Sequence, residues 1–390
     1  MRDKNFRNGF IVGVISAAIL VIGIGAGIYF ATPKGTTVSE MSSKKMNVIE
    51  QLIDAYYYGK IDKNQMTEGT YKGIVEGLDD PYSDYYTKKE YDDMQLENSG
   101  KYVGIGAVVT QDKKNGVISI VKPIDGSPAK KAGLKKGDII AQVNGKEVTG
   151  MELSKVVAKI KGKENTKVTI KILDPKKLKY RTLTLVRKPV ESQSVTSKMI
   201  DKKNKIAYMY IEEFDENTAV QFQKQLAKLK KQKMKGIIFD LRYNPGGMYN
   251  AVCAMLDEIL PKGTIVFTKD KNGNKDEETS DARCLKIPMV VLQNEGSASA
   301  AEIFAGAIQD YKVGKIVGTQ SYGKGVVQNT FPFNDGSALK LTVKKYFTPN
   351  GRNINGKGIT PDVKVENDGK TDKQFDVGKK ILQKEMKYGQ

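Results

Sequence analysis

The chain has 390 residues, with 64 Lys and Arg against 45 Asp and Glu, two Cys, no Trp and no His. The absence of histidine excludes Ser-His-Asp and Cys-His catalysis, His-ligated zinc and the H-E-x-x-H metalloproteases, because each needs an imidazole to move a proton or hold a metal. We expect neither a metal nor another cofactor. The formal charge of +19 comes mostly from lysines spread along the chain, which indicates a solvated surface and not a nucleic-acid site.

An uncharged stretch of 21 residues runs from Phe10 to Phe30. At about 1.5 Å per residue, a helix of that length crosses a bilayer core of about 30 Å. Arg2, Lys4 and Arg7 precede the stretch, so the positive-inside rule places residues 1–9 in the cytoplasm. The alternative is a cleaved signal peptide, but the stretch is longer than a usual signal core and no small-x-small site follows it. We therefore predict a single-pass anchor in the cell membrane, at residues 10–30, and an extracytoplasmic body.

Residues 31–99 are predicted to form a helical region. Met46, Ile49, Ile53 and Tyr57 recur at steps of three and four residues, which is typical of one helix face. An aromatic-rich turn follows, in which Asp79-Asp80-Pro81 leads into the tyrosines of PYSDYY. A loop packed under the helices would explain this turn equally well, and no chemistry is assigned to it.

Residues 100–188 change to the period of strands. Strands are predicted at Val103–Val109, Gly116–Val121, Gly137–Val143, Val168–Leu173 and Tyr180–Val186, with short helices at Ser127–Ala132 and Leu153–Ile160. Gly104-Ile105-Gly106 and the stretch SPAKKAGLKKGDIIAQVNG resemble the carboxylate-binding loop and the most characteristic segment of a PDZ domain. In such a domain, consecutive backbone N–H groups capture a terminal carboxylate while the peptide adds to a strand edge.

Residues 189–365 are predicted to form an α/β domain. Strands are expected at Lys205–Ile211, Gly236–Leu241, Ile287–Gln293, near Ile316-Val317, at Val326–Phe331 and at Ala338–Tyr346, and helices at Thr218–Leu229, Met248–Leu260 and Ser299–Gln309. A strand, a glycine-rich turn and a helix occur in this order twice, in FDLRYNPGG and in VLQNEGSASAAE. The ends of buried strands are where α/β proteins place their sites.

The second turn contains two serines, Ser297 and Ser299, just before a helix. Ser299 and Glu302 form an S-x-x-E capping box, which is a structural reason for a serine at this position. A serine at a helix N-terminus also lies beside free N–H groups and a positive dipole end, as an oxyanion site requires. Both roles fit Ser299.

A serine nucleophile needs a base, and without histidine the candidate is a buried lysine held neutral by desolvation. Lys324 lies between Gly323 and Gly325 and leads into an apolar strand. The structural alternative is a loop lysine hinged by two glycines.

Together, DLRYNPGG, NEGSASAAEIFAGAIQD, GKGVVQ and GRNINGKGITPDV resemble the carboxyl-terminal processing proteases, tail-specific serine peptidases with an embedded PDZ domain. The resemblance runs from about residue 40 to 365. It implies that Ser299 is the nucleophile, Lys324 the general base and Gln328 the residue that orients the lysine. It also implies an oxyanion hole made by the N–H of Ala300 with a glycine of the NPGG turn, Gly246 or Gly247.

These roles are chemically consistent with one another. Gln328 lies four positions after Lys324, which is two strand steps and hence the same face, and its amide can hold the amine without keeping it ionised. One departure is Lys161, in Ile160-Lys161-Gly162-Lys163, where the family often has arginine. If that arginine couples peptide binding to activation, the coupling is in doubt here, because a lysine lacks the planar fork.

The sequence therefore predicts a multidomain α/β chain that consists of an anchor, a helical region, a PDZ domain, a Ser-Lys peptidase core at residues 189–365 and a second helical region at residues 366–390. Its predicted function is that of a serine endopeptidase that binds accessible, apolar C-terminal tails of proteins and cleaves them. Two alternatives stay open at this point: a catalytically inactive PDZ scaffold at the membrane surface, and Ser297 as the nucleophile. The resemblance also suggests a homodimer through the terminal helical regions, and a disulfide between Cys253 and Cys284 is left open.

Overall fold

The computed structural model describes residues 38–112, 115–124, 126–281 and 284–388. These residues fall into two compact units, one up to Gly69 and the other from Thr70 onward. The predicted cytoplasmic tail and the predicted anchor at residues 10–30 lie outside the described residues. Over the described ranges, none of the helices is long and apolar enough to cross a membrane.

The first unit consists of helix α2 (Val38–Tyr56) and the beginning of helix α3 (Lys63–Glu76). Asp62 caps α3, because its carboxylate accepts the Gln65 N–H at 3.0 Å. The helical spacing predicted around Met46 and Ile53 is confirmed, although Tyr57 lies just after the end of α2.

The aromatic turn after α3 leads into strand β1 (Asp84–Tyr86) and helix α4 (Lys88–Asn98). The rings of Tyr71 and Tyr85 contact each other, with centroids 5.3 Å apart. β1 pairs antiparallel with β18 (Ala338–Phe347), a strand near the other end of the sequence. The turn is therefore tied to the second half of the chain as well as to the helix before it.

The PDZ-like region contains β2 (Lys101–Gly104), β3 (Ala107–Gln111), β4 (Ile118–Pro123), α5 (Pro128–Lys131), β5 (Ile139–Val143), β6 (Lys146–Glu147), α6 (Leu153–Ile160), β7 (Lys167–Asp174), β8 (Lys179–Val186) and β9 (Lys188–Glu191). Its main sheet has the order β3-β4-β5-β7-β8, so β3 is an edge strand. The prediction of a single strand at Val103–Val109 was wrong. The strand is interrupted at Ile105-Gly106, and the residues before this interruption belong to β2, which pairs with β9.

The core sheet has six strands in the order β10-β11-β12-β15-β16-β19. They are β10 (Val195–Asp201), β11 (Ile206–Ile211), β12 (Gly236–Asp240), β15 (Met289–Gln293), β16 (Gly314–Gly318) and β19 (Val363–Lys364). All pairs are parallel except β10 with β11. Every residue of β12 and β15 is buried, because both faces of the sheet are covered.

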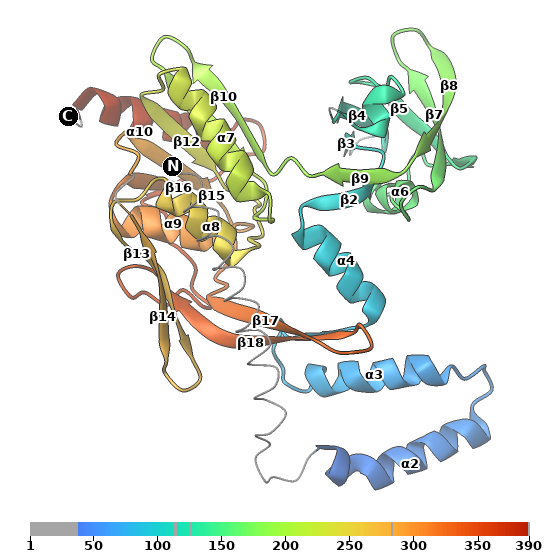
Figure 1. Cartoon of the computed structure of the whole chain (residues 1–390). Coiled ribbons are helices and arrows are strands. Elements are labelled where there is room, and N and C mark those ends of the chain that lie inside the picture. The colour runs from blue at the N-terminus through green and yellow to red at the C-terminus, as the bar shows by residue number, and fades with distance from the viewer. Residues whose placement is uncertain (1–37, 113–114, 125, 282–283, 389–390) are drawn as a thin grey trace, which may run out of the picture. The chain divides into compact units, whose positions relative to one another are not determined.

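Helices α7 (Thr218–Lys231), α8 (Tyr249–Asp257) and α9 (Ala300–Asp310) lie on one face of this sheet, and α10 (Lys373–Tyr388) lies on the other (Figure 1). Phe239 of β12 packs between Phe222 and Phe304 on the first face. Its neighbour Ile238 belongs to the second cluster, with Leu382 of α10. The predicted C-terminal helix is confirmed. Cys253 and Cys284 are both free thiols.

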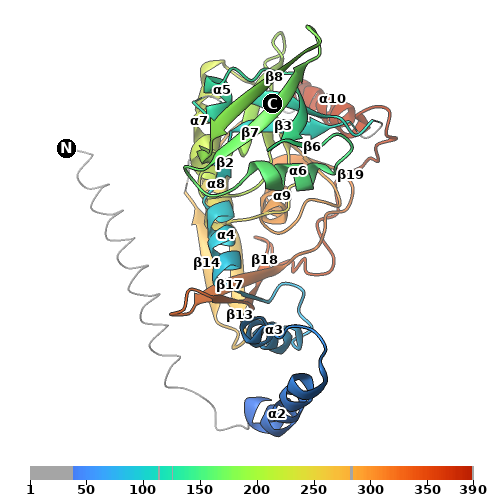
Figure 2. The ribbon, with the colours of Figure 1, turned by 90° about the vertical axis from the view of Figure 1, so that its right-hand side faces the viewer.

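A second sheet contains β1, β18, β13 (Gly263–Asp270) and β14 (Lys275–Ser280), with β17 (Val326–Pro332) also paired to β18. β17 and β18 run side by side as an antiparallel pair (Figures 1 and 2). The sequence predicted both of these strands but not the β13–β14 hairpin. The outer strand of that hairpin, KDEETS, is almost fully exposed and has no apolar alternation.

Candidate active site

The first glycine-rich turn follows β12 and requires glycine at two positions. Gly246 and Gly247 have φ of 99° and 131°, which side chains rarely adopt. A Cβ on Gly247 would lie 2.2 Å from the Phe214 carbonyl oxygen, and one on Gly246 would lie 2.7 Å from the Cβ of Ser299. This turn therefore approaches the serine turn as closely as a bare backbone allows.

The second turn follows β15 and is joined to the first by hydrogen bonds. The Ala298 N–H donates to the Asn244 carbonyl at 3.0 Å, and the Tyr243 N–H donates to the Asn294 side-chain oxygen at 2.8 Å. β12 and β15 are adjacent parallel strands, so their carboxyl ends meet at one edge of the sheet. The structure thus brings both sequence motifs together.

The two serines of the second turn have different environments. Ser297 is 1% exposed, and its hydroxyl donates to the Leu241 carbonyl at 2.8 Å while accepting the Asn294 N–H at 2.9 Å. Ser299 is partly exposed and has φ 54° and ψ −115°. A non-glycine residue with this backbone conformation carries strain of about 1–3 kcal/mol, as is typical of functional turns between a strand and a helix. Ser297 therefore has a structural role, whereas Ser299 has the exposure and the strained backbone that a nucleophile would need.

Two backbone N–H groups beside Ser299 are available for an oxyanion. Helix α9 begins at Ala300, and among the described residues no hydrogen bond uses the N–H of Ala300 or of Gly247. The Gly246 N–H, in contrast, donates to the Asn244 side chain at 2.8 Å. Of the two predicted glycines, Gly247 is the one with a free donor.

Lys324 lies in a loop that is pressed against the segment containing GRNINGKG. A Cβ on Gly323 would lie 2.9 Å from the Lys357 nitrogen, and one on Gly325 would lie 2.4 Å from the Asn355 nitrogen. The Gly356 N–H also donates to the Gly323 carbonyl at 2.8 Å. The glycines around Lys324 therefore permit close packing and are not a flexible hinge.

Glu302 connects the turn that contains Ser299 to the loop that contains Lys324. Its side chain is fully buried, and it accepts the N–H groups of Ser299 at 2.8 Å and Lys324 at 2.9 Å. It also accepts the Gly323 N–H at 2.7 Å and the Ser321 hydroxyl at 2.6 Å. Burial raises the pKa of the Glu302 carboxyl, and these four hydrogen bonds oppose that rise. The capping box predicted the contact with Ser299 but not those with the lysine loop.

The electrostatic surroundings of Lys324 disfavour its charged form. Burial lowers the pKa of its ammonium group, and the like charge of Lys340 lowers it further, while Asp80 acts in the opposite direction. In the described part of the chain, none of the ion pairs includes Lys324. Its Nζ lies 4.7 Å from the centroid of the Tyr82 ring. Tyr82 belongs to the aromatic-rich turn before β1, for which the sequence predicted no chemical role.

The side chain of Gln328 is held by a residue other than Lys324. Its side-chain nitrogen donates to the Thr342 hydroxyl of β18 at 3.2 Å. β17 begins only at Val326, and its register shifts between Val327 and Gln328. Strand alternation therefore does not extend from Lys324 to Gln328, so that part of the argument fails.

In the PDZ-like region, the predicted carboxylate-binding loop lies at the start of the edge strand β3. The Ile105 carbonyl accepts the Ala129 N–H at 2.7 Å, and the Gly106 carbonyl accepts the Ser127 hydroxyl at 2.9 Å. No hydrogen bond among the described residues uses the N–H of Ile105 or Gly106. Gly104, the first residue of this loop, ends β2 and is buried. The ammonium of Lys161 lies 5.4 Å from the centroid of the Tyr102 ring.

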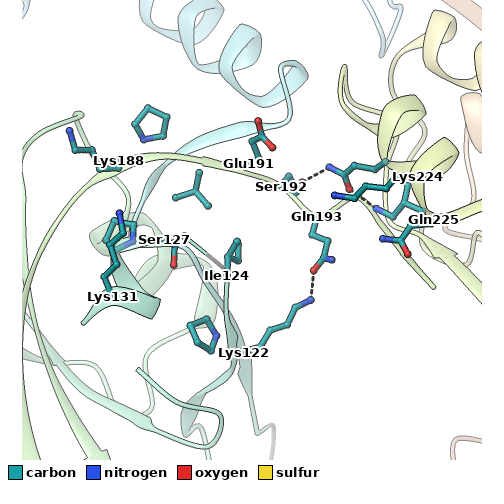
Figure 3. Close-up of a pocket in the computed structure, with 17 residues that line it drawn as sticks. Lys122, Ile124, Ser127, Lys131, Lys188, Glu191, Ser192, Gln193, Lys224 and Gln225 are labelled. Carbon is teal, nitrogen blue, oxygen red and sulfur yellow. Dashed lines mark hydrogen bonds between the residues drawn. The ribbon is translucent and has the colours of Figure 1, made fainter. Parts of the chain in front are cut away.

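A cavity of about 870 Å³ lies elsewhere, along the segment between β9 and β10 (Figure 3). Lysines and serines line it, including Lys122, Lys131 and Ser127. The Ser127 hydroxyl donates to the Gly106 carbonyl and accepts the Lys130 N–H at 3.2 Å, so it caps α5. Lys122 is hydrogen-bonded to Gln193. These contacts give the cavity residues structural roles, and Ser299 and Lys324 do not line it.

The site combines a strained serine in the second glycine-rich turn, free N–H groups beside it and a half-buried lysine that has no ion pair among the described residues. Together these features define a serine peptidase on an α/β sheet. Comparisons with known proteins agree. Residues 205–365 match the model of peptidase family S41, residues 93–173 match the PDZ domain, and residues 30–90 match the N-terminal domain of the activating protease CtpB.

Curated relatives include a probable CtpA-like serine protease of Staphylococcus aureus strain COL, 36% identical over 360 residues that cover 90% of this chain and 70% of the relative. The protein with the same description from Staphylococcus epidermidis is 35% identical, with 91% and 72% covered. The chain belongs to the carboxyl-terminal processing proteases of peptidase family S41, and it is a serine endopeptidase.

Solved structures give the same fold. The photosystem II D1 C-terminal processing protease is 28% identical, with a TM-score of 0.50 and 89% of this chain and 92% of that chain covered. A putative S41 protease from Bacteroides fragilis has a TM-score of 0.55 at 17% identity, with 84% and 93% covered, and supports the fold alone.

Proposed function

We propose that this serine endopeptidase is anchored in the cell membrane, acts outside the cytoplasm, captures the C-terminal tails of proteins through its PDZ domain, and cleaves them with a Ser299–Lys324 dyad. The observation that carries the dyad is the shared carboxylate of Glu302. By accepting the backbone N–H groups of both residues, it fixes the two loops relative to each other.

In the proposed reaction, neutral Lys324 takes the proton of the Ser299 hydroxyl as its oxygen attacks the peptide carbonyl. The N–H groups of Ala300 and Gly247 hold the developing oxyanion. The Lys324 ammonium then gives its proton to the leaving amine as the carbon–nitrogen bond breaks. A water molecule then gives a proton to neutral Lys324 as its oxygen attacks the carbonyl of the acyl-enzyme ester. The Lys324 ammonium returns a proton to the Ser299 oxygen as the ester bond breaks, and the carboxyl product leaves. Gln328 is assigned to orienting the lysine, through a small shift of its side chain from Thr342.

Tail capture is supported by the free edge of β3 and the free N–H groups of Ile105 and Gly106. An extended peptide adds to such an edge as a further strand, and its terminal carboxylate binds consecutive N–H groups. A similar solved structure is named as a C-terminal processing protease. Membrane anchoring is supported by the uncharged stretch at residues 10–30, and a homodimer through the terminal helices remains a proposal.

The dyad is tested with the full chain in detergent and a peptide that ends in an apolar, flexible tail. Ser299→Ala and Lys324→Ala should each lower kcat at least a thousandfold, because the two groups act as a unit. Ser297→Ala is the matched control and should keep kcat within about tenfold, with a lower melting temperature. Full activity of Ser299→Ala, or loss confined to Ser297→Ala, would refute the assignment.

Tail recognition and anchoring need separate measurements. A peptide whose terminal carboxylate is replaced by an amide should show a KM at least tenfold higher if the PDZ loop binds that carboxylate. Removal of residues 1–30 should move the protein from the membrane fraction to the soluble fraction without loss of activity. Collecting cleaved C-termini from cells with wild-type protein and with Ser299→Ala would identify the substrates. An inactive PDZ scaffold would show no difference between those two samples.

A further inference from the structure

The aromatic turn before α4 places a tyrosine ring against the proposed general base. The Nζ of Lys324 lies 4.7 Å from the centroid of the Tyr82 ring. An ammonium within about 6 Å of a ring centroid is attracted by the negative face of the ring. Tyr82 and Lys324 are far apart in the sequence, so a dedicated connection must bring them together.

That connection is built from several hydrogen bonds. β1, which follows Tyr82, pairs with β18 in register from Asp84↔Lys340 to Tyr86↔Ala338. The Ser83 hydroxyl oxygen accepts the Thr342 N–H at 3.0 Å, and Asp80 accepts both the Ser83 hydroxyl at 2.6 Å and the Tyr82 N–H at 3.2 Å. The backbone that carries the Tyr82 ring is therefore held in place on both sides of this residue.

The charged groups around Lys324 give its ammonium form little net electrostatic stabilisation. Lys340 on β18 disfavours it, as does burial, and Asp80 in the turn favours it. Glu302 on α9 accepts the Lys324 backbone N–H at 2.9 Å. The nearby phenols of Tyr82 and Tyr346 are neutral, since burial raises the pKa of both. Tyr322 precedes Lys324 in the same loop, and its side chain interacts with that of Tyr82.

We propose that Tyr82 is a positioning residue for Lys324, whose ring face stabilises the lysine ammonium in the interval between its two proton transfers. This inference rests on the proposed dyad. The proton moves from the Ser299 oxygen to Nζ as the carbon–oxygen bond forms, and from Nζ to the leaving amine as the carbon–nitrogen bond breaks. An uncharged ring stabilises the ammonium more weakly than a carboxylate would, so the resting lysine can still be neutral.

The test is the pH dependence of kcat/KM in three variants of the full chain. Tyr82→Leu removes the ring, so the Lys324 pKa should fall and the rising limb of the profile should move by about half to one unit toward lower pH. The plateau of kcat should fall about tenfold, because a weaker base deprotonates Ser299 less well. Tyr82→Phe keeps the ring and should keep the limb in place. Tyr71→Leu is the matched control. It removes a ring that packs on Tyr85 of the same segment, and it should also leave the rising limb in place.

A second readout is independent of catalysis. In the Ser299→Ala background, the rate at which acetic anhydride labels Lys324, followed by peptide mass spectrometry across pH, reports the Lys324 pKa directly. Tyr82→Leu should shift this titration toward lower pH by the same amount. An unshifted titration, with Lys324→Ala still inactive, overturns the role of Tyr82 but not the dyad. An active Lys324→Ala overturns the dyad, and the labelling then still decides whether the ring stabilises the ammonium.

Discussion

The Tyr346 hydroxyl donates a hydrogen bond to the backbone carbonyl of Ser299 at 3.1 Å. Tyr346 belongs to β18 of the second sheet and is 1% exposed. Its own N–H donates to the carbonyl of Gly325, beside Lys324, at 3.1 Å. One residue of the second sheet therefore holds the backbone of both the proposed nucleophile and the proposed base.

Tyr346→Phe should lower kcat about tenfold with little change in KM. The variant keeps the buried ring but removes one of three donors to the Ser299 carbonyl, which then keeps only the N–H groups of Glu302 and Ile303, so the strained turn loses a restraint. The free energy of unfolding should fall by about 1 kcal/mol, the usual value of one hydrogen bond. Steady-state kinetics and thermal unfolding check both effects, with Tyr180→Phe as an exposed control. A raised KM at unchanged kcat would contradict the positioning role.

Glu302→Ala should reduce kcat at least a hundredfold and lower the melting temperature by several degrees. It leaves the N–H groups of Ser299, Gly323 and Lys324 buried without an acceptor, and each unsatisfied group costs about 1–3 kcal/mol. Glu302→Gln should show a smaller loss, because one amide oxygen remains as an acceptor. Glu295→Gln is the matched control, because Glu295 is exposed and lies in the glycine-rich turn just before α9. Wild-type kcat in folded Glu302→Ala would show that the two loops are held without this carboxylate.

The rate should depend on pH through the charge on Lys324. A base works only when unprotonated, so kcat/KM should rise with pH and level off below the ordinary lysine pKa, because burial lowers the pKa of Lys324. Lys340→Met removes a like charge, which should raise that pKa and move the limb to higher pH. Asp80→Asn removes an opposite charge and should move it to lower pH. Each shift should be about half a unit and should shrink at high salt. Shifts of the same sign in both variants would exclude this electrostatic account.

Gln328→Glu should lower activity at neutral pH and move the limb to higher pH by about one unit or more, since a carboxylate near Lys324 favours its ammonium form. Gln328→Leu removes the hydrogen bond to Thr342 without adding charge, so it should reduce kcat with no comparable shift. Profiles of the two variants, measured side by side, separate charge from orientation. If neither profile moves and kcat stays unchanged, Gln328 has no part in positioning the base.

Much of the fold follows from local patterns in the sequence. The fully buried strands β12 and β15 are short apolar runs, and α9 has a continuous apolar face, so their type and position were predictable. The break at Ile105-Gly106 and the polar strand β14 were not, because a glycine turn inside an apolar run and an exposed edge strand leave no periodic signal.

The candidate site was predictable only in part. Composition pointed to a lysine base, and the resemblance to a family selected Ser299 and Lys324. The contacts of Tyr346, Thr342 and Tyr82 were missed, because strand pairing over long sequence separations creates them and no local spacing encodes such pairs. Glu302, near the start of α9, was a usable signal in the sequence. Apolar residues lie on both sides of it, which indicates a buried carboxylate with a role beyond capping the helix.

Helix α10 has a consequence for the support of the two glycine-rich turns. Leu382, Phe375 and Ile381 cover Ile238, Val290 and Leu292, the outer-face residues of the strands that end in the two glycine-rich turns. Arg242, just after β12, is also paired with Asp372 at the start of this helix. Without α10, this face of the sheet would be bare and the two turns would lose part of their support. Changes in a helix far from Ser299 in the sequence would therefore reach the candidate site through the strands that carry it.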